Sequence, residues 1–124
     1  MSKILDEDLK LVEQSIYLPL VLSVLEYDRK VTEITPFKIK LVYVDLIEHT
    51  MLKVQKDLKK INEEMRKLKM KVIRGNNDGL FTEYNIYYKG YHEEHRFFNA
   101  NLKNNTQKLL SIYLIGMYHP LLKD

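Results

Sequence analysis

Residues 44–72 read VDLIEHTMLKVQKDLKKINEEMRKLKMKV, and the spacing of their apolar side chains determines the predicted fold. Apolar residues recur at intervals of three and four positions: Val44, Ile47, Met51, Val54, Leu58, Ile61, Met65, Leu68 and Val72. This repeat places them on one narrow stripe of an α-helix, whereas the side chains of a β-strand alternate every two residues. Thr35-Pro36 is typical of a helix start and Arg74-Gly75 of a helix end, so we expect one long helix between them.

A second run with the same alternation begins at Phe81 and continues through Tyr84, Tyr88, Tyr91, His95, Phe98, Leu102, Asn105, Leu109, Ile112 and Gly116. It predicts a second long helix, capped by Asn77 or Asp78 and ended by His119-Pro120. Gly90 would cost this helix about 1 kcal/mol relative to Ala and is a candidate kink. A β-strand over residues 80–88 is the competing interpretation, because Tyr and Phe favour sheets. We prefer the helix because the alternation continues well beyond residue 88.

Five turn-forming residues, Gly-Asn-Asn-Asp-Gly at 75–79, separate the two patterns. A turn this short forces two long helices to lie antiparallel. The hairpin would place Val72 near Phe81 and Met65 near Tyr88.

The N-terminal third supplies the remaining cover for this hairpin. Leu5, Leu9, Val12 and Ile16 form an apolar stripe, which continues beyond Pro19. A proline inside a helix removes a hydrogen bond and bends it. Residues 3–33 therefore form either one bent helix or two helices that meet near Pro19. Both arrangements give an all-α protein, a three- or four-helix bundle built on a long antiparallel helical hairpin, with residues 1–124 as a single helical domain.

The composition narrows the function classes. The 124 residues are 45% apolar and 30% charged, as in ordinary globular proteins, and include no cysteine. Disulfide scaffolds, cysteine-ligated zinc and thiol catalysis are therefore excluded. Acidic residues at positions 6–8 occupy the place of a signal peptide's apolar core. The most apolar stretch, residues 16–25, is shorter than the ~20 residues of a membrane-spanning helix. We expect a cytoplasmic protein without a membrane association.

The net charge of +3 is unevenly distributed along the chain. Residues 53–74 hold nine basic and three acidic groups, whereas residues 1–35 hold four basic and seven acidic groups. On the predicted helix, the basic residues form one face that includes Lys53, Lys56, Lys60, Lys67 and Arg74. Such a face favours nucleic acid or an acidic protein surface. We prefer the alternative, a solvated helix face with weak pairs such as Lys60–Glu64 and Glu63–Lys67.

The segment His92-Glu93-Glu94-His95 is the most suggestive cluster for metal binding. A di-metal carboxylate bundle needs Glu-x-x-His motifs, and the sequence contains none. A looser zinc site from His92, His95 and a third ligand is an alternative. We prefer a half-buried His95 and a surface His92, and expect neither a metal nor a cofactor.

Aromatic residues concentrate in the C-terminal half of the chain, at Tyr84, Tyr87, Tyr88, Tyr91, Phe97 and Phe98. Most would pack in the core, although tyrosine is also favoured at protein interfaces. Tyr87 and Phe97 lie off the apolar stripe, so they are candidates for an exposed partner-binding patch. No serine has a neighbouring base and no glycine-rich phosphate loop is present, so we expect no enzyme activity.

Four segments of the chain carry a resemblance: Lys71-Val72-Ile73-Arg74-Gly75, Phe81-Thr82-Glu83-Tyr84, Tyr88-Lys89-Gly90-Tyr91 and Arg96-Phe97-Phe98-Asn99. In them the chain resembles small uncharacterised helical proteins of low-GC Gram-positive bacteria and their phages or mobile elements. The resemblance implies no activity, and no residue takes a role from it.

These observations favour a non-catalytic protein-interaction or regulatory protein. A long apolar heptad stripe exceeds what a short N-terminal segment covers, so we expect a homodimer through the hairpin or the N-terminal helix. The alternative is a small nucleic-acid-associated regulator that uses the basic helix face.

Overall fold

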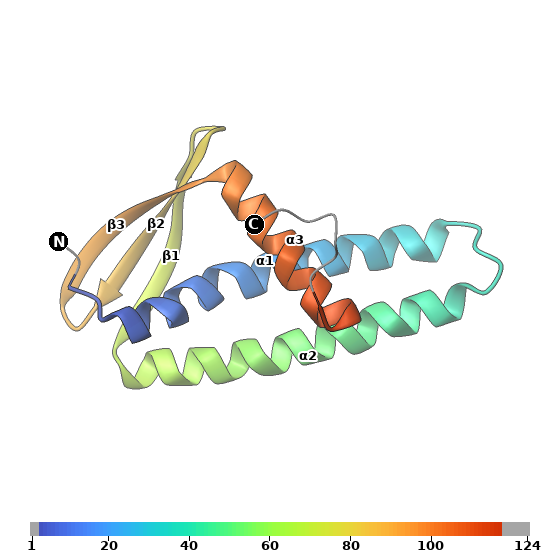
Figure 1. Ribbon diagram of the computed structural model, residues 1–124, viewed down its shortest axis with the longest axis horizontal. Helices are drawn as coiled ribbons and strands as arrows, with labels where there is room; N and C mark the ends of the chain where they lie inside the picture. The colour runs from blue at the N-terminus through green and yellow to red at the C-terminus, as the bar shows by residue number, and fades with distance from the viewer. Residues whose placement is uncertain (1–2, 118–124) are drawn as a thin grey trace.

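The computed structural model describes residues 3–117. Three helices and three strands follow one another in the order α1 (Asp6–Ile34), α2 (Lys40–Lys67), β1 (Met70–Asn77), β2 (Phe81–Tyr88), β3 (Tyr91–Phe98) and α3 (Asn99–Ile115). Helices α1 and α2 form a long antiparallel hairpin, the sheet covers one end of it, and α3 crosses it near the middle (Figure 1). The fold is therefore α+β, and the predicted all-α helical bundle is wrong.

Helix α2 follows the predicted apolar stripe for most of its length. Val54, Ile61 and Met65 are buried in the core, and Ile47 and Leu58 pack against it. The helix begins at Lys40 and ends at Lys67, so it does not reach the predicted end at Arg74-Gly75. The 3-4 repeat includes Val72 by coincidence. Val72 lies on β1, where it is apolar because its side chain faces inward.

Residues 81–98 form two strands of an antiparallel sheet with the order β1-β2-β3, so the second predicted helix is wrong over this range. The competing interpretation of residues 80–88 as a strand is confirmed. The buried side chains of β2 alternate every second residue, at Thr82, Tyr84, Ile86 and Tyr88. The 3-4 pattern combined residues from both faces of the sheet, because aromatic side chains occur on both.

The register of the sheet replaces the predicted helical pairs. Met70 pairs with Tyr88 and Val72 with Ile86, so Val72 does not face Phe81 and Met65 is not on the paired segment. The β2–β3 hairpin turns at Lys89 and Gly90, whose φ angles of 50° and 86° suit a two-residue turn of strands with a right-handed twist. Gly90 is thus a turn residue and not a helix kink.

The other hairpin turns directly after β1. The Asp78 carboxylate accepts hydrogen bonds from the backbone N–H groups of Leu80 and Phe81 at 2.9 and 2.8 Å. The Asn77 side chain accepts another from Gly79. The predicted turn at residues 75–79 is therefore displaced toward the C-terminus, and it joins two strands where two helices were expected.

The C-terminal part of the second pattern is helical. Helix α3 begins at Asn99 and ends before Gly116, which has a φ of 80°. Such a left-handed glycine is a common helix end, and the predicted end at His119-Pro120 lies outside the described residues. Tyr113 donates a 2.5 Å hydrogen bond to Asp57, which fixes α3 against α2. Burial, and then this bond, raise the pKa of Tyr113.

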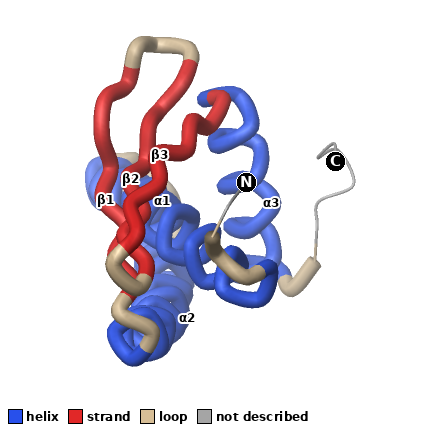
Figure 2. Tube along the Cα trace, turned by 90° about the vertical axis from the view of Figure 1, so that its left-hand side faces the viewer, coloured by secondary structure: helices blue, strands red, loops and turns tan. Residues whose placement is uncertain are grey.

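Helix α1 runs through Pro19 as one helix, in agreement with the single-helix alternative. Its buried face, which includes Val12, Val21 and Leu25, meets the buried faces of α2 and β2 in one core. The helices lie on one side of the sheet, and the other side carries no helix in the described chain (Figure 2). This side is called the outer face of the sheet below.

Candidate functional site

The predicted basic face is confined to α2. Lys53, Lys56, Lys60 and Lys67 are exposed on this helix. Within residues 3–117 none of them forms an ion pair, so the predicted pairs Lys60–Glu64 and Glu63–Lys67 are not made. Arg74 does not extend this face, because it lies on β1.

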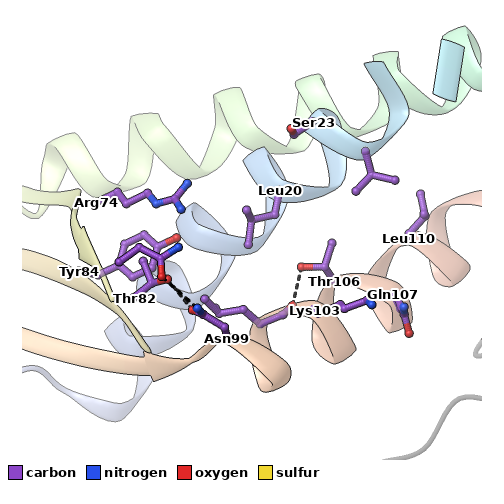
Figure 3. A pocket seen from close by; sticks show the side chains of 13 residues that line it. Leu20, Ser23, Arg74, Thr82, Tyr84, Asn99, Lys103, Thr106, Gln107 and Leu110 are labelled. Atoms are coloured by element: carbon purple, nitrogen blue, oxygen red, sulfur yellow. Dashed lines mark hydrogen bonds between the residues drawn. The ribbon is translucent and has the colours of Figure 1, made fainter. Parts of the chain in front are cut away.

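Arg74 instead lines a groove of about 520 Å³ between α1, α3 and the sheet. Figure 3 shows the Arg74 side chain extending from β1 toward Leu20 of α1. Lys103 and Leu110 of α3 form the opposite wall. Tyr84 also lines the groove, and burial raises the pKa of its phenol. Sequence reasoning missed this groove, because it assigned the residues of the sheet and of α3 to a helical hairpin.

A chain of hydrogen bonds fixes the wall of the groove near the start of α3. Thr82 donates to the Asn99 side chain at 2.6 Å, and Asn99 donates to the Asn77 side chain at 3.0 Å. Thr106 donates to the Leu102 carbonyl of its own helix. The polar wall residues are thus held in place by one another, whereas Arg74 and Lys103 form no ion pair within residues 3–117.

Tyr87 and Phe97 lie on opposite faces of the sheet, so they do not form one patch. Tyr87 is exposed on the outer face and stacks on His92 at a centroid distance of 4.7 Å. Phe97 is half-buried on the inner face, where its ring meets Tyr84 edge-on at 5.5 Å.

The two histidines of the proposed metal cluster are also separated by the sheet. His92 lies 2.9 Å from the Asn85 side chain on the outer face. His95 lies on the inner face, 2.9 Å from Glu93. Three residues apart on a strand, the two rings point to opposite sides and cannot bind one metal ion together. Within residues 3–117 no group of three candidate metal ligands is present.

The free end of the α1–α2 hairpin carries an unusually apolar surface. Within residues 3–117, it holds eleven of the twenty exposed large apolar side chains: Val24, Tyr27, Val31, Ile34, Phe37, Ile39, Leu41, Val42, Tyr43, Leu46 and Leu52. Ile34 is 83% exposed and Leu41 68%. We call these residues the apolar end. The sheet and α3 cover the opposite half of the hairpin (Figure 1). Nothing in the described chain covers the apolar end.

Three residues of the apolar end, Val24, Val31 and Leu46, face the same side of the hairpin. On α1, Val24 and Val31 each precede a residue of the buried stripe, Leu25 and Thr32. On α2, Leu46 likewise precedes Ile47. In two antiparallel helices that face each other, the position one residue before the contact stripe points to the same side on both. The spacing of Val24, Tyr27, Val31 and Ile34 was the available sequence signal for this surface.

The charged residues of this region are nearly balanced. Residues 24–52 contain four basic and five acidic groups. Arg29 forms an ion pair of 3.1 Å with Glu33 of its own helix, and its pair of 3.0 Å with Glu48 joins α1 to α2. Phe37 and Tyr43 contact each other at a ring distance of 5.0 Å, so the loop at residues 35–39 is packed onto α2. The apolar end is therefore an ordered, near-neutral surface.

No helix in residues 3–117 has a stretch apolar and long enough to cross a bilayer.

Comparison with known proteins identifies a family and a relative that match nearly the whole chain. A family model described as "YhjD protein" matches residues 3–118. The "Uncharacterized protein YhjD" of Bacillus subtilis (strain 168) is 32% identical over 116 residues, which cover 94% of this chain and 97% of the relative. No solved structure matches. The predicted resemblance to small proteins of Gram-positive bacteria is confirmed by this relative. The chain belongs to the YhjD protein family.

Proposed function

We propose that this protein is a non-catalytic interaction protein that forms a homodimer through the apolar end of its α1–α2 hairpin. One observation carries the proposal, namely the concentration of exposed large apolar side chains between Val24 and Leu52. Monomeric proteins expose such side chains singly, and a continuous patch marks an interaction surface.

The size of the apolar end suits a stable interface. A standard protein interface buries about 800 Å² per partner. Eleven large side chains, most of them about half exposed, offer an area of that order. Tyrosines at positions 27 and 43 add the amphipathic rings that often contribute most to binding energy.

The charges of the apolar end favour a second copy of the chain as its partner. Two copies carry a net charge of only −1 each over residues 24–52, so they approach without strong repulsion. Two antiparallel helices also form a surface that is readily self-complementary about a twofold axis, the commonest symmetry of soluble homo-oligomers. Packing two hairpins together would complete a four-helix arrangement from two chains.

Cross-linking of single cysteines would locate the interface, because the chain contains no cysteine of its own. We expect Val31→Cys to give a covalent dimer with a short bismaleimide reagent. Ile73→Cys is the matched control, because Ile73 has similar exposure, 42% against 40%, but lies on the outer face of the sheet. Equal dimer formation by both variants, or dimer from Ile73→Cys alone, would overturn the proposal.

A second function is supported by the unpaired lysines of α2. Lys53, Lys60 and Lys67 recur every seven residues, and each is exposed and without an ion pair within residues 3–117. Such a row of free cations suits the phosphate backbone of a nucleic acid. The protein would then be a small nucleic-acid-associated regulator.

Titration with labelled DNA and RNA at low and high salt tests this second function. Binding should weaken steeply with salt, and reversal of Lys53, Lys60 and Lys67 to Glu should abolish it. Lys30→Glu, an exposed position on α1, is the control. Binding that does not depend on salt, or that persists after the triple reversal, would exclude the basic face as the nucleic-acid-binding surface.

We also propose a cytoplasmic location. The link to phages or mobile elements is a proposal that rests on the sequence resemblance alone.

A further inference from the structure

We propose that the groove between α1, α3 and the sheet binds a small amphipathic carboxylate, with its apolar chain along the helices and its headgroup at Arg74. The volume of about 520 Å³ lies within the ~300–1,000 Å³ range of small-molecule sites. The groove is distinct from the apolar end, although Val24 lies where the two meet.

The helices give the groove an apolar wall. Leu20 and Val24 of α1 face Leu102 and Leu110 of α3 across it. Leu102 is buried, whereas Leu20 and Leu110 are partly buried and pack against the core. This wall offers an acyl or aryl group a surface that excludes water from most of its length.

The sheet end of the groove is positively charged. Its thirteen lining residues include two cations, Arg74 and Lys103, and no carboxylate. Neither cation forms an ion pair within residues 3–117. A guanidinium binds a carboxylate through two parallel hydrogen bonds, which makes arginine the preferred partner of this group. The lining therefore favours an anionic ligand over a neutral or cationic one.

The start of α3 adds to the positive electrostatic potential at this end of the groove. No side chain caps this helix, and its first turn holds no acidic residue. The partial positive charge of a helix N-terminus is therefore not neutralised here. Asn99 and Lys103, in the first two turns, both line the groove. The headgroup would thus meet a side-chain cation and a helix dipole at one end of an apolar wall.

The groove is also organised before any ligand binds. The Thr82–Asn99 hydrogen bond joins β2 and α3 at its floor (Figure 3), and the Asn99–Asn77 bond joins α3 to β1 there. They occupy the polar atoms that would otherwise compete for the cations. A preformed site avoids the cost of ordering side chains on binding.

Titration with octanoate, followed by NMR shifts of the full chain, tests the proposal, and 1-octanol provides a neutral probe of the same length. We expect shifts at groove residues such as Thr106 and a tighter affinity for octanoate than for octanol by at least tenfold. Acetate, which has the headgroup without the chain, should bind too weakly to detect. Octyl phosphate distinguishes a carboxylate site from a general anion site: equal or tighter binding of the phosphate would overturn the assignment to carboxylates.

Variants then separate this groove from other apolar surfaces. Arg74→Gln should weaken octanoate binding at least tenfold and leave octanol binding unchanged, whereas Arg74→Lys should restore part of the affinity. Arg66→Gln, an exposed arginine on α2, is the matched control and should have no effect. Lys103→Gln, on the exposed side of α3, repeats the test if Arg74→Gln unfolds the sheet.

Three further results would overturn the proposal. The first is octanoate binding no tighter than octanol binding. The second is octanoate affinity that neither Arg74→Gln nor Lys103→Gln reduces, since that result would place the ligand on the apolar end of the hairpin. The third is the absence of shifts at the groove at millimolar octanoate.

Discussion

The phenol of Tyr88 donates a 2.5 Å hydrogen bond to the Asp8 carboxylate, which joins the end of β2 to the first turn of α1. Both side chains are buried, with exposures of 5% and 7%. The bond raises the pKa of Tyr88, because it stabilises the protonated phenol beside a carboxylate. This contact connects two segments that lie 80 residues apart in the sequence, and it fixes the sheet on the hairpin.

Replacing Tyr88 by Phe should destabilise the protein by about 1–3 kcal/mol, because the buried Asp8 carboxylate loses its partner. Urea unfolding followed by circular dichroism would measure the change. Tyr91→Phe is the control, since Tyr91 is 54% exposed, and should change stability by less than about 0.5 kcal/mol. Equal effects of the two substitutions would show that the Tyr88–Asp8 bond does not hold the sheet.

Gly90→Ala distinguishes the α+β fold from the helical hairpin by the sign of its effect. In a helix interior, alanine would stabilise the protein by about 1 kcal/mol relative to glycine. In the turn, where Gly90 has a φ of 86°, alanine should destabilise it by about 1–2 kcal/mol through backbone strain. Lys89→Asn is the control and should be neutral or stabilising, because asparagine tolerates left-handed backbone. A stabilising Gly90→Ala would contradict the β2–β3 hairpin.

The turn at Asp78 should make stability depend on acidic pH. Hydrogen bonds from the backbone N–H groups of Phe81 and Leu80 lower the pKa of Asp78 below its ordinary value of 3.8. A lowered native pKa contributes stability that is fully present above 3.8 and is lost as the pH falls through the native value. The difference in unfolding free energy between wild type and Asp78→Asn should therefore shrink as the pH falls from 5 toward 2, about the range in which such a carboxylate takes up its proton. A constant difference across this range would exclude a role for the Asp78 charge.

Charged substitutions in the apolar end should dissociate the dimer without unfolding the chain. Leu46→Glu places a carboxylate in the proposed interface and should weaken self-association at least tenfold, because an unpaired buried charge is costly. Leu46 is 50% exposed in the single chain, so the monomer's stability should change by less than about 0.5 kcal/mol. Leu5→Glu, at a 55% exposed position outside the apolar end, is the control. Sedimentation velocity would compare the two variants.

Helix α2 was predictable because its apolar stripe has a single interpretation, whereas its pairing with α1 in a hairpin was not predicted. From Val54 to Met65, one face of α2 is apolar and the rest is polar or charged, so only a helix buries the former and exposes the latter. The sheet was not predictable by the same rule. Its tyrosines and phenylalanines occupy both faces, as Tyr87 and Phe97 show, and a two-faced aromatic strand also satisfies a 3-4 repeat.

The candidate sites were not predicted, because the strands were taken for parts of two helices. Arg74 was assigned to a helical basic face, because the strand boundary at Met70 was not recognised. Because Arg74 lies on β1, it lines a groove whose other residues come from α1, β2, α3 and the end of β1 itself. Such a groove depends on tertiary packing between distant segments, which periodicity does not report. The apolar end, by contrast, was present in the sequence as the spacing of Val24, Tyr27, Val31 and Ile34.

Sedimentation equilibrium of the unmodified chain, over micromolar concentrations, tests the central claim most directly. We predict a species of twice the 14.9 kDa chain mass, which dissociates on dilution. A single species of 14.9 kDa throughout that range would contradict self-association through the apolar end.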